Sequence, residues 1–357
     1  MMNLSHFEIR RWLAEDDPAQ LEDLWKQADE VRLDHVGDEV YLRGLIELSN
    51  ACDRRCLYCG LRANNAHLPR YRMSREEILD CADEAVRLGY GTVVLQSGEE
   101  AVFDLDWMLG IIRHVKTNTP LAVTLSLGER SREELVAMKE AGADRYLLRF
   151  ETSNRELFDR IHPPTVGGRR RNRLEILGEI REIGYEVGSG VMIGIPGQTI
   201  EDLVLDLETF VRIDLDMIGM GPFIAHPDTP LGQHAEKFLA APDEQVAPTE
   251  LNTYKMIALA RLVCPRANIP ATTALATLNR YRGRELGLMR GANIIMPNLT
   301  PTRYRAEYEI YPDKACIGEA ASECATCVHL RIQAIGRTLG AGRGDSPNIV
   351  GRKNAEW

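Results

Sequence analysis

The sequence predicts an α/β fold: a complete (β/α)8 TIM-type barrel, preceded by a helical segment and followed by a short extension. Three observations favour this fold. Short runs rich in leucine or β-branched residues alternate with stretches of helical periodicity, eight such runs are present, and the alternating region spans about 250 residues, which is typical of a closed barrel. A doubly wound parallel sheet is the alternative.

The eight runs are the predicted strands. They are expected to be parallel, because the helical stretches between them are long enough to form right-handed crossovers. By residue number, the predicted strands are 45–48, 92–95, 122–125, 146–148, 187–193, 217–219, 269–272 and 293–296.

Three of the predicted helices start with a capping box, in which a hydroxyl residue and an acidic residue three positions later satisfy free backbone amides. The pairs are Ser74 with Glu77, Ser131 with Glu134, and Thr199 with Asp202. Apolar residues at helical spacing predict a further helix over residues 17–33. The expected organisation is a helical segment over 1–38, a barrel over 39–311 and an extension over 312–357.

Composition excludes several classes of protein. Hydrophobic residues make up 44% of the 357 positions, which excludes a disordered or fibrous chain. The 43 basic residues are outnumbered by 53 acidic ones, so the net charge is −10 and nucleic acid is not an expected partner. No apolar run approaches the ~20 residues needed to cross a bilayer, so no membrane partner is expected either. We expect a soluble, cytoplasmic protein.

Six of the eight cysteines fall in two tight groups, which in a reducing compartment indicates metal binding. The first group, Cys52, Cys56 and Cys59, has the spacing Cys-x3-Cys-x2-Cys and follows the first predicted strand, at the catalytic end of a barrel. Three thiols would leave one iron of a 4Fe-4S cluster open to another ligand. A zinc loop that borrows His67 is the alternative.

Three arginines, Arg54, Arg55 and Arg62, lie close to these cysteines in the sequence. Positive charge near a thiol stabilises its thiolate form, which is the form that binds metal. The sequence therefore predicts that these arginines favour thiolate over thiol.

The cysteine triad, with the aromatic Tyr58 just before the third cysteine, resembles the signature of the radical S-adenosylmethionine (SAM) superfamily. The resemblance implies that the amino and carboxylate groups of SAM bind the open iron. One electron from the cluster would then cleave SAM to methionine and a 5′-deoxyadenosyl radical.

The same resemblance implies a set of SAM-binding residues. Gln96-Ser97-Gly98-Glu99 resembles the superfamily segment that contacts the SAM amino group, although by itself it is a common turn. Glu151 would bind the ribose or amino part and Arg173 the carboxylate, with a solvated salt bridge as the alternative. The remaining implied contacts, Met192 above all, could equally be packing residues; they are Tyr58, Ser126, Met192 and Ile224.

Longer stretches resemble the HydE family, the radical SAM maturases of [FeFe] hydrogenase. Among them are CLYCGLR, YRMSREEI, VVLQSGE, VTLSLGE, GIPGQTIEDL and GPFIAHPDTPL. The resemblance implies action on a cysteine-bound organometallic iron precursor made by the maturase HydG, and delivery of the product to the scaffold HydF. Biotin synthase and methylornithine synthase are related alternatives, and a non-enzymatic iron–sulfur carrier is an alternative of another class.

Family resemblance also implies a substrate cavity lined by polar side chains. Arginine suits a carboxylate because it donates two parallel hydrogen bonds, and threonine or tyrosine can donate single ones. Each of these residues could instead be a satisfied structural residue. The expected set is Arg43, Gln96, Thr124, Arg149, Thr272, Thr273, Tyr308 and Tyr311. No general base is expected, because radical chemistry depends on positioning and water exclusion.

The second cysteine group, Cys316, Cys324 and Cys327, follows the last predicted barrel strand. Some HydE members carry an auxiliary cluster here and others lack it, so the resemblance implies an accessory 2Fe-2S or 4Fe-4S cluster. Zinc or unused thiols are the alternatives. Cys81 and Cys264 are expected to be packing residues. The sequence leaves the role of His226 open.

Overall fold

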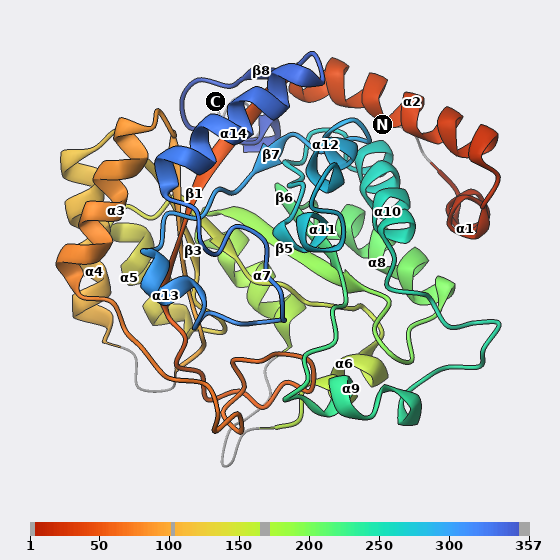
Figure 1. The fold of residues 1–357 in the computed structure, drawn as a ribbon, viewed down its shortest axis with the longest axis horizontal. Helices are drawn as coiled ribbons and strands as arrows, with labels where there is room; N and C mark the ends of the chain where they lie inside the picture. The colour runs from red at the N-terminus through yellow and green to blue at the C-terminus, as the bar shows by residue number, and fades with distance from the viewer. Residues whose placement is uncertain (1–3, 101–103, 165–171, 350–357) are drawn as a thin grey trace.

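A computed structural model describes residues 4–100, 104–164 and 172–349. Parallel strands form the centre of the molecule, and most of the helices lie outside them (Figure 1). None of the described helices combines the length and apolar composition needed to cross a membrane.

The strands form one parallel sheet in the order β6-β5-β4-β3-β2-β1-β7, with β8 beside the start of β1. Every predicted strand except 269–272 is confirmed, with ends shifted by a few residues. The bounds are β1 Glu39–Ser49, β2 Thr92–Ser97, β3 Ala122–Ser126, β4 Arg145–Leu147, β5 Glu186–Ile193, β6 Met217–Pro222, β7 Ile294–Ile295 and β8 Thr338–Leu339.

The predicted strand at 269–272 is a correction. This stretch makes only single bridges, from Asn268 to Met217 and from Pro270 to Ile294. Proline has no backbone N–H, so it cannot donate a ladder hydrogen bond and interrupts regular pairing. Seven of the strands therefore form a continuous hydrogen-bonded row, and residues 268–271 lie between its two ends.

The three predicted capping boxes are confirmed at the starts of α3 (Arg75–Arg87), α5 (Arg132–Glu140) and α8 (Ile200–Arg212). The other elements are α4 Leu105–Asn118, α6 Arg155–Ile161, α7 Arg173–Glu182, α9 Pro230–Gln233, the 3-10 helix Ala235–Lys237, α10 Glu250–Val263, α11 Thr273–Leu278, α12 Gly283–Leu288, α13 Thr302–Arg305 and α14 Ala321–Ala334.

The N-terminal segment contains two helices, of which the second was predicted. Helix α2 (Pro18–Val36) packs on α10 and buries Leu24 and Ala28 completely. Helix α1 (His6–Ala14) packs on α8 and α10, and it starts with a capping box between Ser5 and Glu8 that the sequence analysis missed.

The chain after β8 returns to the N-terminal ends of the strands. Arg145, at the start of β4, is fully buried and donates to Glu186 (2.8 Å), to Thr92 (2.9 Å) and to the carbonyl oxygen of Arg343 (2.9 Å), and it also pairs with Asp345. These contacts attach the C-terminal extension to the N-terminal ends of the strands, the floor of the sheet, through charge-assisted hydrogen bonds.

Replacing Arg145 with methionine is expected to lower the free energy of unfolding by about 3–5 kcal/mol, because the buried Glu186 loses its closest ion-pair partner. Denaturant unfolding followed by circular dichroism measures the change. Arg132→Gln is the matched control, since the Arg132–Glu182 pair is exposed, and it should leave the midpoint almost unchanged. Equal midpoints for the two variants would contradict this account of the floor.

Candidate active site

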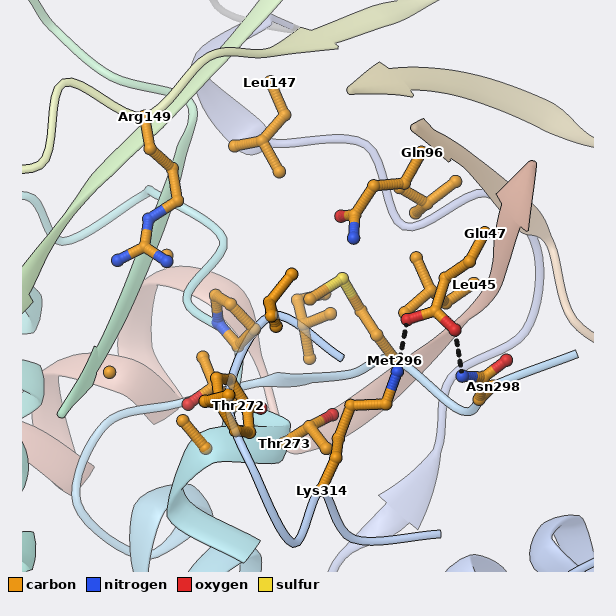
Figure 2. A pocket seen from close by; sticks show the side chains of 18 of the residues that line it. Leu45, Glu47, Gln96, Leu147, Arg149, Thr272, Thr273, Met296, Asn298 and Lys314 are labelled. Carbon is orange, nitrogen blue, oxygen red and sulfur yellow. Dashed lines mark hydrogen bonds and ion pairs between the residues drawn. The ribbon is translucent and has the colours of Figure 1, made fainter. Parts of the chain in front are cut away.

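A cavity of about 330 Å³ is lined by side chains from the parallel strands and from the segments that follow them. Figure 2 shows its side chains converging from opposite walls: Gln96 and Leu147 face Thr272 and Thr273 across the space, and Arg149 reaches in from a third side. Tyr58 and Cys59 from the cysteine loop also line the cavity, so its wall is continuous with the predicted cluster site.

The loop that carries Cys52, Cys56 and Cys59 follows β1 directly, as predicted. Backbone hydrogen bonds fix it to three separate parts of the chain: Asp53 N–H donates to the carbonyl oxygen of Glu99 (2.7 Å), Leu57 N–H to that of Ile161 (2.9 Å) and Gly60 N–H to that of Ile310 (3.1 Å). The three thiols are thus presented by a loop whose shape is set by its neighbours.

Two glycines permit this close packing. A Cβ atom at Gly98 would lie 2.1 Å from the carbonyl oxygen of Ala51 and 2.9 Å from the Cβ of Cys52. A Cβ atom at Gly60 would lie 2.1 Å from the carbonyl oxygen of Glu309 and 2.5 Å from Nε2 of His226. His226, whose role the sequence left open, is therefore a buried packing partner of the cysteine loop.

Arg54 acts on the Cys56 thiol in the predicted direction, because its charge lowers the pKa of Cys56, but burial has the larger effect. Burial raises the pKa of Cys56 to about 12 and that of Cys59 well above its usual range, and it outweighs the opposing charges of Arg173 and Arg54 at Cys56. Buried thiols of this kind are neutral, and a bound cation must supply the charge that stabilises their ionised form.

The donor set fits a cluster better than a single ion. Within residues 4–100, 104–164 and 172–349, no three Cys, His, Asp or Glu side chains converge on one metal position. A 4Fe-4S cubane does not need three ligands to converge on one position, because each thiolate binds a different iron atom. His67, the proposed fourth zinc ligand, is exposed.

Beside the cysteine loop, four charged side chains form a network. Arg54 donates to Glu99 (2.5 Å) and pairs with Glu129 (2.7 Å), and Arg173 donates to the other oxygen of Glu129 (3.0 Å). Burial raises the pKa of Glu99 despite the nearby Arg54. Glu99 and Arg173 are among the predicted SAM contacts. Glu129 was not predicted; it lies in the loop before α5 and pairs with both Arg54 and Arg173.

Glu151 has a left-handed backbone, with φ of 64°, which is uncommon for a residue with a side chain. Its carboxylate pairs with Arg149 (3.1 Å), and its Oε1 atom lies 3.5 Å from the Tyr58 hydroxyl oxygen. The strained backbone aims this carboxylate into the cavity, which it lines together with Tyr58.

Among the described residues, several buried polar atoms have no hydrogen-bond partner, and six of the side chains concerned line this cavity. Five of the atoms belong to donor groups and one is a carboxylate oxygen: Nε of Arg43, Oγ1 of Thr124, Nε of Arg149, Oγ1 of Thr272, Nε of Arg284 and Oε2 of Glu151. Burial, together with the nearby Arg145, lowers the pKa of Arg43 to about 9. Such a wall is costly when empty and suits a polar, anionic ligand.

Most of the predicted site residues meet at this cavity. Those that line it are Arg43, Tyr58, Gln96, Thr124, Arg149, Glu151, Met192, Ile224, Thr272, Thr273 and Tyr311. Ser126 is paired with Gln96 in the sheet, and the side chain of Tyr308 is hydrogen-bonded to that of Gln96. Ser97, Gly98, Glu99 and Arg173 lie beside the cysteine loop and do not line the cavity.

The sequence analysis missed a buried ion pair on the cavity wall. Lys314 donates to one oxygen of Glu47 (2.8 Å), and Asn298 donates to the other (2.8 Å), as the dashed lines in Figure 2 show. Glu47 lies near the end of β1, and Lys314 comes 267 residues later. The signal in the sequence was a charged residue among the apolar residues of the predicted strand 45–48.

The second cysteine group lines a separate cavity of about 350 Å³ that shares Arg284, Ala315 and Cys316 with the first. Cys316 has φ of 64°, and Cys324 and Cys327 lie on α14. A hydrogen bond with Cys324 and the nearby Arg284 lower the pKa of Cys316 to about 6. The other two cysteines, Cys81 and Cys264, pack where the sequence placed them, at α3 and at the end of α10.

Comparison with known proteins agrees with this geometry. A model of the radical SAM superfamily matches residues 46–210. The fold resembles the crystal structure of methylornithine synthase (PylB), with a TM-score of 0.78, 25% identity and coverage of 94% of each chain. It also resembles HydG from Carboxydothermus hydrogenoformans, with a TM-score of 0.74, 20% identity and coverage of 93% of this chain and 75% of that one. Fold and site are those of a radical SAM enzyme.

The sequence narrows this class. It is 47% identical, over 93% of this chain and 91% of the relative, to the [FeFe] hydrogenase maturase subunit HydE of Thermotoga maritima. The chain therefore belongs to the HydE family of the radical SAM superfamily.

Replacing Gly98 with alanine is expected to reduce iron binding strongly, because the added methyl group would overlap the carbonyl oxygen of Ala51 and push the Cys52 backbone away. Iron content after anaerobic reconstitution measures the effect. Gly178→Ala in α7 is the control, since a Cβ there meets nothing within 4 Å. Full iron loading of the Gly98 variant would contradict the close-packing argument.

Proposed function

We propose that this chain is a radical SAM maturase that acts on a cysteine-bound organometallic iron precursor during assembly of the active-site cluster of [FeFe] hydrogenase. The observation that carries the proposal is the 47% identity to HydE over nearly the whole chain. The cavity supports it, because its unpartnered donors suit a small anionic ligand and Cys59 of the cysteine loop lines its wall.

In this proposal, Cys52, Cys56 and Cys59 hold a 4Fe-4S cluster. SAM would be held beside it by residues from seven places in the chain: Tyr58, Gln96 to Glu99, Ser126, Glu151, Arg173, Met192 and Ile224. When bound, the cluster and SAM supply the 5′-deoxyadenosyl radical. The protein's own part is to orient SAM through Glu151 and Arg173 and to hold the target within reach of its ribose.

The substrate would lie in the cavity beyond SAM. Arg149 and Arg43, which both line the cavity, would offer positive charge to an anionic, amino-acid-like complex. Gln96, Thr124, Thr272, Thr273, Tyr308 and Tyr311 are the expected neutral partners.

A primary alkyl radical abstracts hydrogen from whatever it meets, so its enclosure must exclude other donors. We propose that the ring of strands is a complete barrel, closed by residues 268–271. Support comes from the hydrogen bonds of Ile218 N–H to the carbonyl oxygen of Asn268 (2.9 Å) and of Ala271 N–H to that of Ile294 (2.9 Å).

We also propose an accessory iron–sulfur cluster at Cys316, Cys324 and Cys327, supported by their position on one cavity. HydG would supply the substrate and HydF would receive the product. The second candidate within enzymes is a biotin synthase or methylornithine synthase activity, favoured by the similarity to PylB.

A SAM-cleavage assay separates an enzyme from an iron–sulfur carrier. The anaerobically reconstituted protein should produce 5′-deoxyadenosine from SAM and dithionite. Cys56→Ala should abolish the product, because it removes a ligand of the first cluster, whereas Cys324→Ala should leave most of it. Chromatography of the quenched reaction measures both. A Cys324 variant as inactive as the Cys56 variant would reverse the ranking of the two cysteine groups.

Thr124→Val tests the substrate cavity. The Thr124 hydroxyl has no partner among the described residues, so valine of similar shape should not lower the unfolding temperature. Hydrogenase activation in a maturation assay with HydG and HydF should nevertheless fall roughly three- to tenfold, because one hydrogen bond to substrate is lost. Loss of stability without loss of activation would show that the hydroxyl is structural.

A further inference from the structure

A buried carboxylate on α8 has no part in the site described so far. Asp206 is completely buried, and its Oδ1 atom accepts two hydrogen bonds from Ser153, one from the backbone N–H (2.5 Å) and one from the hydroxyl (2.6 Å). Its Oδ2 atom has no hydrogen-bond partner in the described part of the chain. All of its hydrogen bonding is therefore directed at one residue, two positions after Glu151.

One turn earlier on α8, Asp202 makes a parallel contact. Its Oδ1 atom accepts a hydrogen bond from the side-chain amide of Asn154 (2.8 Å). Asn154 is the N-cap of α6 and accepts from the backbone N–H of Leu157 (3.0 Å). Two carboxylates of α8 thus hold the two residues that connect Glu151 and Thr152 to α6.

The other end of α6 supports the cysteine loop. The carbonyl oxygen of Ile161 accepts from Leu57 N–H (2.9 Å), and Nε2 of His162 lies 3.0 Å from the Tyr58 hydroxyl. Nδ1 of His162 lies 3.0 Å from the carbonyl oxygen of Phe158, an acceptor, so Nδ1 carries the proton and Nε2 accepts from Tyr58. Helix α6 is therefore a short strut between α8 and the residues next to Cys56 and Cys59.

We propose that Asp206 is a positioning residue for the SAM site, which fixes Ser153 and thereby sets both the carboxylate of Glu151 and, through α6, Leu57 and Tyr58 of the cysteine loop. The inference rests on the proposed function in one respect: SAM is the ligand whose binding Glu151 and this loop determine.

The chemistry of Asp206 suits such a role. Burial raises its pKa to about 7, the Ser153 hydrogen bonds oppose this shift, and the charges of Asp202 on α8 and Glu151 after β4 add to it. The native state thus holds a proton on Asp206 up to about pH 7, whereas the unfolded chain loses it near its usual pKa of 3.8. The contribution of Asp206 to the free energy of unfolding therefore falls as the pH rises from 3.8 to about 7, and it stays low above pH 7. Above about pH 7 the buried carboxylate is ionised at a cost in stability, which indicates a function other than folding.

Asp206→Asn keeps the size of the side chain and removes the charge that strengthens both Ser153 hydrogen bonds. The matched control is Glu208→Gln, an equal change on the same helix at an exposed residue that contacts His6 and not Ser153. Hydrogen exchange of the protein without cluster or SAM measures the strut directly. Amides of residues 56–60 and 153–162 should exchange about tenfold faster in the Asp206 variant and at the wild-type rate in the control.

SAM affinity gives the second measurement, from the change that SAM produces in the electron paramagnetic resonance spectrum of the reduced, reconstituted protein. Asp206→Asn should weaken SAM binding about tenfold at pH 8 without lowering the unfolding temperature. Wild-type affinity should fall as pH is lowered from 8 to 6, and that of the variant should not change. Ser153→Ala, which removes one of the two donors, should give a smaller loss in the same direction and serves if the asparagine variant does not fold.

The outcomes are distinct. Wild-type exchange rates together with wild-type SAM affinity in Asp206→Asn would overturn the proposal, as would a lower unfolding temperature with unchanged affinity, which would make Asp206 structural. If the wild-type protein binds no SAM, the proposed function fails, and the exchange rates still decide whether Asp206 positions the loop.

Discussion

The rest of the site depends on the main-chain hydrogen bonds that fix the cysteine loop to Glu99, Ile161 and Ile310. These three residues follow β2, end α6 and come late in the chain, so the loop takes its shape only once the whole sheet is assembled. Gly60 and Gly98 matter for the same reason: they let backbone meet backbone where any side chain would keep the segments apart.

Several features of the site lower the stability of the protein when no ligand is bound. Unpartnered donors face the cavity, a charged pair is buried in its wall, Glu151 holds a left-handed backbone, and the thiols are pushed toward their neutral form. Each of these features costs free energy in the empty protein, and each is offset when a charged ligand or cluster binds. The surrounding apolar strands and capped helices provide the stability that offsets these costs.

Local patterns in the sequence were enough for most strands, three capping boxes and the cysteine triad, because each is written within a few neighbouring residues. Three features were beyond such reading. The stretch at 269–272 has the composition of a strand, but Pro270 has no backbone N–H and therefore interrupts the pairing. Glu47 and Lys314 meet only through the fold. The raised pKa of Cys56 was not predicted, because burial is a tertiary property and outweighs the charge of Arg54. The residues that would bind SAM were named by resemblance, not by pattern.

The two cavities share a wall, and Arg284 is the only cationic residue in the described part of that wall. Its Nη1 atom lies 3.7 Å from the sulfur of Cys316 and its Nη2 atom 3.5 Å from the hydroxyl of Thr273, so one guanidinium faces both compartments. The charge of the second cysteine group therefore affects the electrostatic potential in the first cavity. Without those thiols, Arg284 would remain as a buried cation between the two cavities, with no sulfur anion beside it.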